Sequence, residues 1–267
     1  MTLTYFDHSV PHLIEEYYQL SFSENAVPFQ STVLPVGFTH ITHLFYGKQK
    51  AILNSKEMPL QDTIISGQFF RSYQLHCASE SMSFGISFHP TALFKILNTD
   101  VSKLDNKHMA LSEFHPEFHA KIQSVFSNFS SPESMVKHLN KFFSDIKLTT
   151  NKNTENIDIA INLIKNKEGL LSVQEILEHL NISQKTLETQ FKKIVGLTPG
   201  KYVRLYRFLK LMRKYESQEI AIKDLMFMFD YYDRSHFSKD FKLFMSETPK
   251  SYFKKDYPLL KAVFKNS

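Results

Sequence analysis

Two short segments in the C-terminal third carry polar side chains at spacings that suit contacts with the edges of DNA bases. If both segments are helices, Leu187 and Phe191 mark the buried face of the first, and Phe237 and Phe241 mark that of the second. Arginine and lysine can donate to guanine O6 and N7, and glutamate can accept from cytosine N4. The positions that then face outward are Gln184, Lys185, Thr186, Glu188, Thr189, Arg234, Ser235, His236, Ser238 and Lys239.

Both segments belong to one repeated unit. An apolar residue, a Phe-Lys pair and a Thr-Pro pair recur in the same order, first from Leu187 to Pro199 and again, 50 positions later, from Phe237 to Pro249. Threonine before proline is a typical helix start, so a further helix begins where each unit closes. After the first unit this helix is expected to run to about Ser217 and to connect the two units.

Capping signals divide each unit into two helices. Ser172 followed by Glu175 predicts a capping box, and Ser183 predicts the start of the next helix. In the other unit Asp233 predicts the second start, whereas Ala221, at the position of Ser172, is a poor cap. Two helix-turn-helix motifs are therefore expected. Their second helices fit successive major grooves, each about 12 Å wide and about 34 Å apart on one face of the duplex.

The charge distribution agrees with double-stranded DNA as the partner. Residues 155–267 hold 20 Lys and Arg against 14 Asp and Glu, whereas residues 1–154 hold 12 against 13. All the excess positive charge of the chain therefore lies in the part that carries the two motifs, as is typical of a polyanion-binding domain joined to a neutral one.

The N-terminal part follows a different pattern. Residues 82–88 alternate apolar and small side chains, several β-prone runs precede them, and helical patterns follow up to residue 143. Residues 8–19 predict a short helix. We predict an α+β protein: a small antiparallel β-barrel-like, cupin-like domain with helices at 1–146, a polar linker at 147–155, and at 156–267 an all-α DNA-binding domain of two helix-turn-helix units joined by a long helix.

Aromatic side chains of the N-terminal part could line an apolar pocket for a small-molecule effector. Phenylalanine at alternating strand positions also builds ordinary core, and a homodimerisation face is an equally supported role for this part. The candidate lining residues are Phe38, Phe45, Phe69, Tyr73, Phe84 and Phe88.

Neither a metal nor a cofactor is expected, although ten of the 12 histidines precede the linker. On a strand, His40 and His43 would point to opposite faces, and His115 precedes a helix start at Pro116, which separates it from His119. The sequence has no nucleophile elbow, phosphate-binding loop or dinucleotide fingerprint, so we expect no enzymatic activity.

Cysteine usage and hydropathy point to the cytoplasm. Cys77 is the one cysteine, so no intramolecular disulfide can form, which fits a reducing compartment. The N-terminus lacks the basic and apolar regions of a secretory signal, and no apolar run approaches the ~20 residues needed to cross a bilayer. No membrane association is expected.

The C-terminal part, residues 157–256, resembles the DNA-binding domain of the AraC/XylS transcription regulators of bacteria. The most specific stretch is YYDRSHFSKDFK at 231–242, followed by ETPKSY at 247–252. The family commonly has Gly-Phe where Asp230-Tyr231 stands. A looser resemblance to a domain found ahead of this one rests on LPVG at 34–37, ISG at 65–67 and FGISFHP at 84–90; it implies a small β-barrel-like domain with no assigned ligand.

The resemblance implies roles for individual residues. The implied base-reading residues are Lys185, Glu188, Thr189, Arg234, Ser235, His236 and Lys239. Phosphate contacts are expected from Lys192, Lys193, Lys201, Arg204, Lys242 and Lys250, together with helix-start amides near Thr198 and Thr248.

The leading interpretation is a sequence-specific transcription regulator, an activator rather than a repressor, with RNA polymerase and a small-molecule effector as further partners to test. Two alternatives stay open: a cupin-like enzyme tethered to DNA, and an effector-independent regulator whose N-terminal domain only dimerises. An architectural DNA binder without sequence preference is disfavoured, because both outward helix faces carry mixed polar residues rather than lysine and arginine alone.

Overall fold

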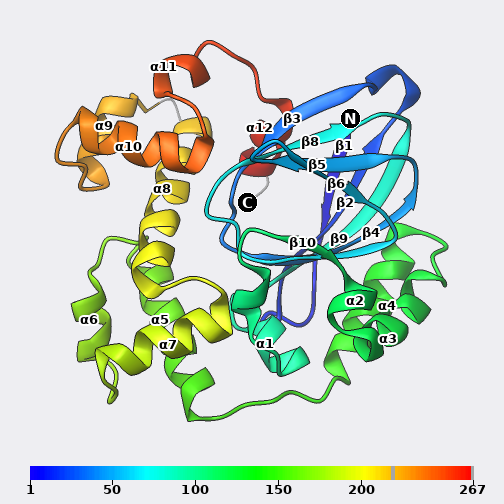
Figure 1. Ribbon diagram of the computed structural model, residues 1–267, viewed down its shortest axis with the longest axis horizontal. Helices are drawn as coiled ribbons and strands as arrows, with labels where there is room; N and C mark the ends of the chain where they lie inside the picture. Colours follow the sequence, from blue (N-terminus) through cyan, green and yellow to red (C-terminus); the bar gives the residue numbers. More distant parts are fainter. Residues whose placement is uncertain (218–219, 266–267) are drawn as a thin grey trace.

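The chain first forms two antiparallel sheets and then a series of helices, and a computed structural model describes its residues 1–217 and 220–265 (Figure 1). The six-stranded sheet has the order β1-β2-β9-β4-β7-β10. Its strands are β1 (Thr2–Phe6), β2 (Ile14–Phe22), β4 (Thr39–Tyr46), β7 (Thr63–Ser66), β9 (Ser81–Phe88) and β10 (His108–Ala110). The four-stranded sheet has the order β3-β8-β5-β6. Its strands are β3 (Phe29–Val33), β5 (Gln49–Leu53), β6 (Lys56–Leu60) and β8 (Tyr73–Cys77).

The predicted antiparallel β domain is confirmed, but the two sheets form an open pair rather than a closed barrel. The helix predicted at 8–19 is wrong, because the second half of this segment belongs to β2, which pairs with β9, and the first half is not helical. That pairing places Ile14 opposite Phe88 and Phe22 opposite Ser81, far apart in the sequence, and it overrides the local pattern.

Alternation on β9 separates two surfaces of the six-stranded sheet. Phe84, Ile86 and Phe88 are fully buried, and the Phe88 ring meets Phe143 of α4 edge-on at 5.6 Å between centroids. On the opposite surface Gly85 lies across from Tyr18 of β2, and a Cβ at Gly85 would stand 2.0 Å from the Tyr18 ring. The aromatic face therefore packs on helices, and the small-residue face accommodates the Tyr18 ring.

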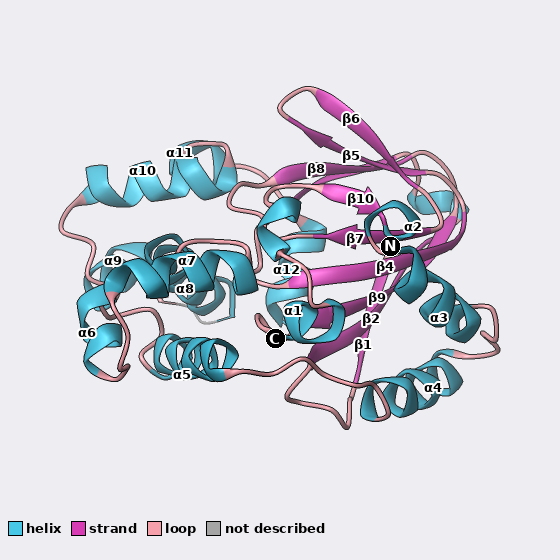
Figure 2. Cartoon of the chain, turned by 60° about the horizontal axis from the view of Figure 1, so that its bottom comes forward, coloured by secondary structure: helices cyan, strands magenta, loops and turns pink. Residues whose placement is uncertain are grey.

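Helices of the N-terminal part cover one side of the six-stranded sheet and one end of the sheet pair (Figures 1 and 2). They are the 3₁₀ segments η1 (Glu24–Ala26) and η2 (Val101–Leu104), and α1 (Ala92–Leu97), α2 (Leu111–Phe114), α3 (Pro116–Phe126) and α4 (Pro132–Ser144). As expected, His115 precedes α3, and its Nδ1 accepts the N–H of Phe118 as a helix cap.

The predicted linker is shorter than expected. Asn151 and Thr154 form a capping box at the start of α5, so residues 152–155 are helical. Asparagine and threonine are common both in loops and at helix N-caps, so composition alone did not show that a helix begins within this polar stretch.

The remaining helices build the C-terminal part. They are α5 (Lys152–Asn166), α6 (Val173–Glu178), α7 (Gln184–Val195), α8 (Pro199–Ser217), α9 (Ile222–Met228), α10 (Arg234–Met245), α11 (Pro249–Tyr252) and α12 (Pro258–Lys265). The last of them, α12, crosses back to the N-terminal part and packs against β3 and β1 as well as α8.

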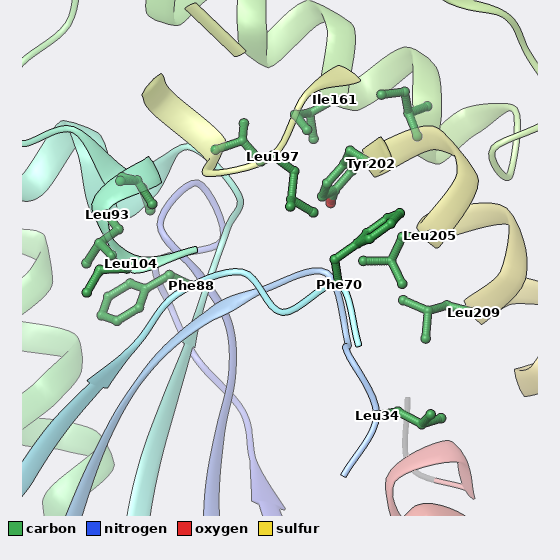
Figure 3. Packing of buried hydrophobic residues seen from close by; sticks show 14 of the residues in the cluster. Leu34, Phe70, Phe88, Leu93, Leu104, Ile161, Leu197, Tyr202, Leu205 and Leu209 are labelled. Carbon is green, nitrogen blue, oxygen red and sulfur yellow. The ribbon is translucent and has the colours of Figure 1, made fainter. Parts of the chain in front are cut away.

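One continuous hydrophobic core joins the two parts of the chain. Figure 3 shows Phe70 of the N-terminal part beside Tyr202 and Leu205 of α8. Polar contacts add to this interface: Lys95 of α1 pairs with Asp158 of α5 at 2.7 Å. A shared apolar core of this kind holds two domains in a defined arrangement, unlike the small polar interfaces that permit free relative motion.

Candidate nucleic-acid interface

The first helix-turn-helix unit consists of α6 and α7. The predicted capping box is present, because the Ser172 amide donates to Glu175 and the Glu175 amide donates to the Ser172 hydroxyl. Ser183 caps α7 by accepting the amide of Thr186, and Gly196 ends the helix at a φ of 101°. α7 buries Leu187, Phe191, Ile194 and Val195.

The outer face of α7 is exposed to solvent. Lys185, Glu188 and Thr189 are all exposed, and the Gln184 amide donates to Glu188 at 2.8 Å. The three residues that resemblance implies as base-reading therefore lie together near the N-terminal end of one exposed helix.

The second unit consists of α9 and α10. Ala221 provides no side-chain cap for α9, as expected, whereas Asp233 accepts the His236 amide at 2.7 Å and caps α10. Asp230, at the usual glycine of the family, adopts a left-handed φ of 52°; asparagine and aspartate tolerate this region better than most residues do. The turn therefore keeps its geometry without glycine.

The outer face of α10 is also exposed to solvent. Arg234, Ser235 and Lys239 are exposed and His236 is half-buried, with its ring 5.1 Å from that of Tyr231. His236 is thus partly engaged in packing the turn, and Arg234 and Lys239 are the better-placed donors to bases.

A buried carboxylate fastens α10 to the connecting helix. Asp240 is 0% exposed and accepts from Arg204 Nε of α8 at 2.6 Å and from the Tyr231 hydroxyl at 3.1 Å. Arg207 lies 3.7 Å from the same carboxylate. Sequence reasoning missed this cluster, although an aspartate between Phe237 and Phe241 on an inward helix face was a signal for it.

The connecting helix α8 separates the two recognition helices. It begins at Pro199 and reaches Ser217, as predicted. In Figure 1, α7 and α10 lie at opposite ends of α8, and both run from left to right. The two exposed faces are therefore carried by one helix of 19 residues.

The residues expected to contact phosphate differ in their surroundings. Lys192, Lys193, Lys201, Lys242 and Lys250 are exposed. Lys193 lies over the Phe94 ring and Lys201 over the Phe70 ring, so both are close to the N-terminal part. Arg204 has the carboxylate of Asp240 as its partner, and we therefore assign it a structural role.

A cavity of about 160 Å³ lies between the two sheets and is bordered by α12. Three of the six predicted lining residues, Phe38, Phe69 and Tyr73, line it. Phe84 and Phe88 instead belong to the core, and Phe45 packs against Phe129 at 4.4 Å. The prediction for these three was wrong, because large alternating residues on β9 and β4 face the helices.

Polar groups of the cavity form two small hydrogen-bonded sets. His40 Nδ1 lies 3.1 Å from the Ser87 hydroxyl, which donates to Glu16 at 3.0 Å. His108 Nδ1 lies 2.7 Å from the Ser66 hydroxyl, and its Nε2 is buried without a hydrogen-bond partner in the described part of the chain.

Burial controls the charge of these groups. It lowers the pKa of His40 to about 4 and, with a contribution from His40, that of His108 to about 3. Burial also raises the pKa of the Glu16 carboxyl. Among the described residues, the lining contains Glu16 and Asp62 but neither lysine nor arginine, and Arg213, which acts on Glu16, is not part of the lining.

Within residues 1–217 and 220–265, no group of three or more His, Cys, Asp and Glu side chains is arranged to hold a metal ion. His40 and His43 do point to opposite faces of β4, since His43 stacks on Phe126 while His40 borders the cavity. No helix within the described ranges is long and apolar enough to span a membrane.

Comparison with protein families finds two matches in this chain. Residues 176–255 match a helix-turn-helix domain, and residues 8–110 match a domain of unknown function, DUF6597. The HTH-type transcriptional activator AarP of Providencia stuartii is 24% identical over 92 residues, which cover 34% of this chain and 68% of that protein.

Among solved structures, those of ToxT of Vibrio cholerae align with most of the chain. One ToxT structure has a TM-score of 0.48 and 14% identity, covering 95% of this chain and 98% of ToxT. ToxT bound to (E)-4-(8-methylnaphthalen-1-yl)but-3-enoic acid gives a TM-score of 0.48 with 13% identity, over 95% of this chain and 99% of ToxT.

Proposed function

Because the chain is a transcription regulator whose DNA-binding domain is of the AraC/XylS type, we propose that it activates transcription from sites that α7 and α10 read in two successive major grooves. The observation that supports this reading is the presence of two capped helices with free polar faces at opposite ends of α8. Activation is proposed because the relative from Providencia stuartii is named as an activator.

Base contacts are assigned to Lys185, Glu188 and Thr189 in the first unit and to Arg234, Ser235, His236 and Lys239 in the second. Phosphate contacts are assigned to Lys192, Lys193, Lys201, Lys242 and Lys250, without Arg204. The two sets differ in function, since phosphate contacts position a protein on the duplex and base contacts select the sequence.

Selection of bound sequences from a random duplex pool tests the two-groove proposal. We expect two half-motifs whose centres lie about 10 base pairs apart, the spacing of adjacent major grooves on one face of the duplex. A single half-motif, or equal retention of random and selected duplexes at two salt concentrations, would contradict it. Placing the selected site upstream of a reporter promoter tests activation, for which contact with RNA polymerase remains a prediction.

The cavity supports a role for the N-terminal part as a sensor. At about 160 Å³ it resembles in size an engineered protein cavity that binds benzene. Its lining combines apolar residues with the unpaired Nε2 of His108. We therefore assign it a small uncharged effector that is mainly apolar and carries one hydrogen-bonding group. Homodimerisation of the N-terminal part and a cytoplasmic location remain parts of the proposal to be tested.

A further inference from the structure

The loop between β7 and β8, residues 67–72, lies where the cavity and both helix-turn-helix units come together. Neighbouring side chains of this loop point to different sides. Phe69 lines the cavity, whereas Gln68, Phe70 and Ser72 contact the C-terminal part. Because these residues share one backbone segment, a backbone displacement at Phe69 would also move the outward residues.

On the outward side, Gln68 reaches the end of the first recognition helix. Its side chain lies against Gly196, where a Cβ would stand 3.3 Å from Gln68 Cγ. The Gln68 amide also donates to the carbonyl of Gly37 at 3.0 Å, and the Tyr202 hydroxyl of α8 donates to the same carbonyl at 3.3 Å. The loop thereby packs against the turn between α7 and α8 and shares the Gly37 carbonyl with Tyr202.

Through Phe70 and Ser72, the same loop reaches the end of the second recognition helix. The Ser72 amide donates to the carbonyl of Phe244 at 2.8 Å, and its hydroxyl donates to that of Ser246 at 3.0 Å. Ser246 is the left-handed C-cap of α10. Phe70 meets the Phe244 ring edge-on at 5.1 Å. One loop of six residues thus holds the C-terminal ends of both α7 and α10.

On the inward side, Phe69 belongs to an aromatic cluster in the cavity wall. Its ring lies 4.8 Å from that of Tyr73 and 4.6 Å from that of His108. His108 is the residue whose buried Nε2 has no partner within the described ranges. A molecule that bonds to this nitrogen would therefore lie beside Phe69, at the centre of the loop.

We infer that the loop 67–72 couples the cavity to the DNA-binding surface by fixing how far apart α7 and α10 lie. Occupancy beside Phe69 and His108 would then change the half-motif spacing that the protein prefers. Gln68, Phe70 and Ser72 act here as positioning residues, since they hold the ends of helices whose other residues face DNA. This inference rests on the proposed two-groove function and on its effector cavity.

The test measures the affinity of the full-length protein for duplexes whose two selected half-motifs are 8 to 13 base pairs apart, and for a duplex with a single half-motif. Phe70→Ala removes the ring that packs on Phe244, and Phe69→Ala removes the ring that lines the cavity. The matched control is Phe129→Ala, because Phe129 is a half-buried phenylalanine that packs on Phe45 at a distance from the loop. Thermal unfolding of every variant shows which of them fold.

We expect the preference for the best spacing to fall by roughly tenfold in Phe70→Ala and Phe69→Ala, a size common for changes within a coupled network. Affinity for the single half-motif should stay within about twofold, because the recognition faces are untouched. Phe129→Ala should keep the wild-type preference. If Phe70→Ala does not fold, Ser72→Ala, which removes only the hydroxyl bond to Ser246, takes its place.

The outcomes distinguish a failure of the loop inference from a failure of the two-groove function on which it rests. A wild-type protein that selects no paired half-motifs contradicts the two-groove function itself. A wild-type preference that survives in the folded outward variant contradicts the loop as a positioning element. A preference that is lost in Phe70→Ala but kept in Phe69→Ala contradicts the coupling to the cavity.

Discussion

Arg204 on the connecting helix donates to Asp240, a carboxylate buried on the inner face of the second recognition helix. The pair fixes the rotation of α10 about its own axis, and so decides which residues of that helix face outward. Replacing Asp240 by Ala removes the acceptor for both Arg204 and the Tyr231 hydroxyl.

We expect Asp240→Ala to lower the free energy of unfolding by about 2–4 kcal/mol, because removing one partner of a buried ion pair leaves the other charge without compensation. The lower part of this range is favoured, since the Arg204 side chain is 41% exposed and can regain water. Urea unfolding measures the effect, with the exposed Asp224→Ala as the control. Equal losses in both variants would show that the buried pair contributes nothing specific.

The assignment of base contacts is tested by removing two exposed cations of α10. Arg234→Ala or Lys239→Ala should each cost about 1–3 kcal/mol at the selected site and relax the preference within one half-motif. Lys121→Ala, which removes an exposed charge from α3, is the control for net charge. Affinity and preference that match this control in both variants would remove these residues from the interface.

The helix-turn-helix units were predictable because their signals are local. Ser172, Ser183 and Asp233 cap the helices that they were expected to cap, and Pro199 begins the connecting helix. Each of these features depends on residues within one or two helical turns, which a single sequence displays directly.

The cavity and the ion cluster were not predictable, because both depend on long-range packing. Sequence alone shows that Phe84 and Phe88 share one face of β9, but not that this face meets α4. The partner of Asp240 lies 36 residues away on another helix. The return of α12 to β3 likewise depends on contacts across more than 200 residues. Patterns of two or 3.6 residues carry no information about such pairings.

Removing a phosphate contact should reduce the salt dependence of DNA binding. Lys242 lies exposed on α10, beyond the base-reading positions. Lys242→Ala should therefore weaken binding about equally at all sequences and reduce the slope of log affinity against log salt by about 1. Binding isotherms at four salt concentrations measure this slope. A changed sequence preference with an unchanged slope would instead place Lys242 at the bases.

Buried histidines should make stability depend on pH. Burial lowers the pKa of His40 and of His89 to about 4, whereas both are near 6.5 in the unfolded chain. Between these values the unfolded chain binds protons that the folded chain does not, so the free energy of unfolding falls as the pH falls. Each histidine contributes at most about 1.4 kcal/mol per pH unit within this window, and less near pH 7, where the unfolded histidine is mostly neutral. Urea midpoints at pH 7, 6 and 5.5 test this, and His40→Gln should show a shallower decline. Midpoints that stay constant would contradict it.

The charge of the effector can be tested before the effector is known. Benzyl alcohol and benzoate have nearly the same shape, but one is neutral and the other is an anion. The cavity lining has Glu16 and Asp62 without lysine or arginine, and its histidines are neutral at pH 7 because burial lowers their pKa. We therefore expect benzyl alcohol to bind and benzoate to bind at least about tenfold more weakly, since a buried anion without a partner is costly.

A third probe isolates the hydrogen bond to His108. Toluene fills the same space as benzyl alcohol but cannot bond to Nε2, so His108→Phe should weaken benzyl alcohol roughly five- to tenfold and leave toluene nearly unchanged, as the net strength of one hydrogen bond implies. Ligand-observed NMR titration measures all three affinities on the full-length protein. Benzoate binding as tightly as benzyl alcohol would show that a cation reaches the cavity, and Arg213 of α8, which acts on Glu16, would be the first residue to test.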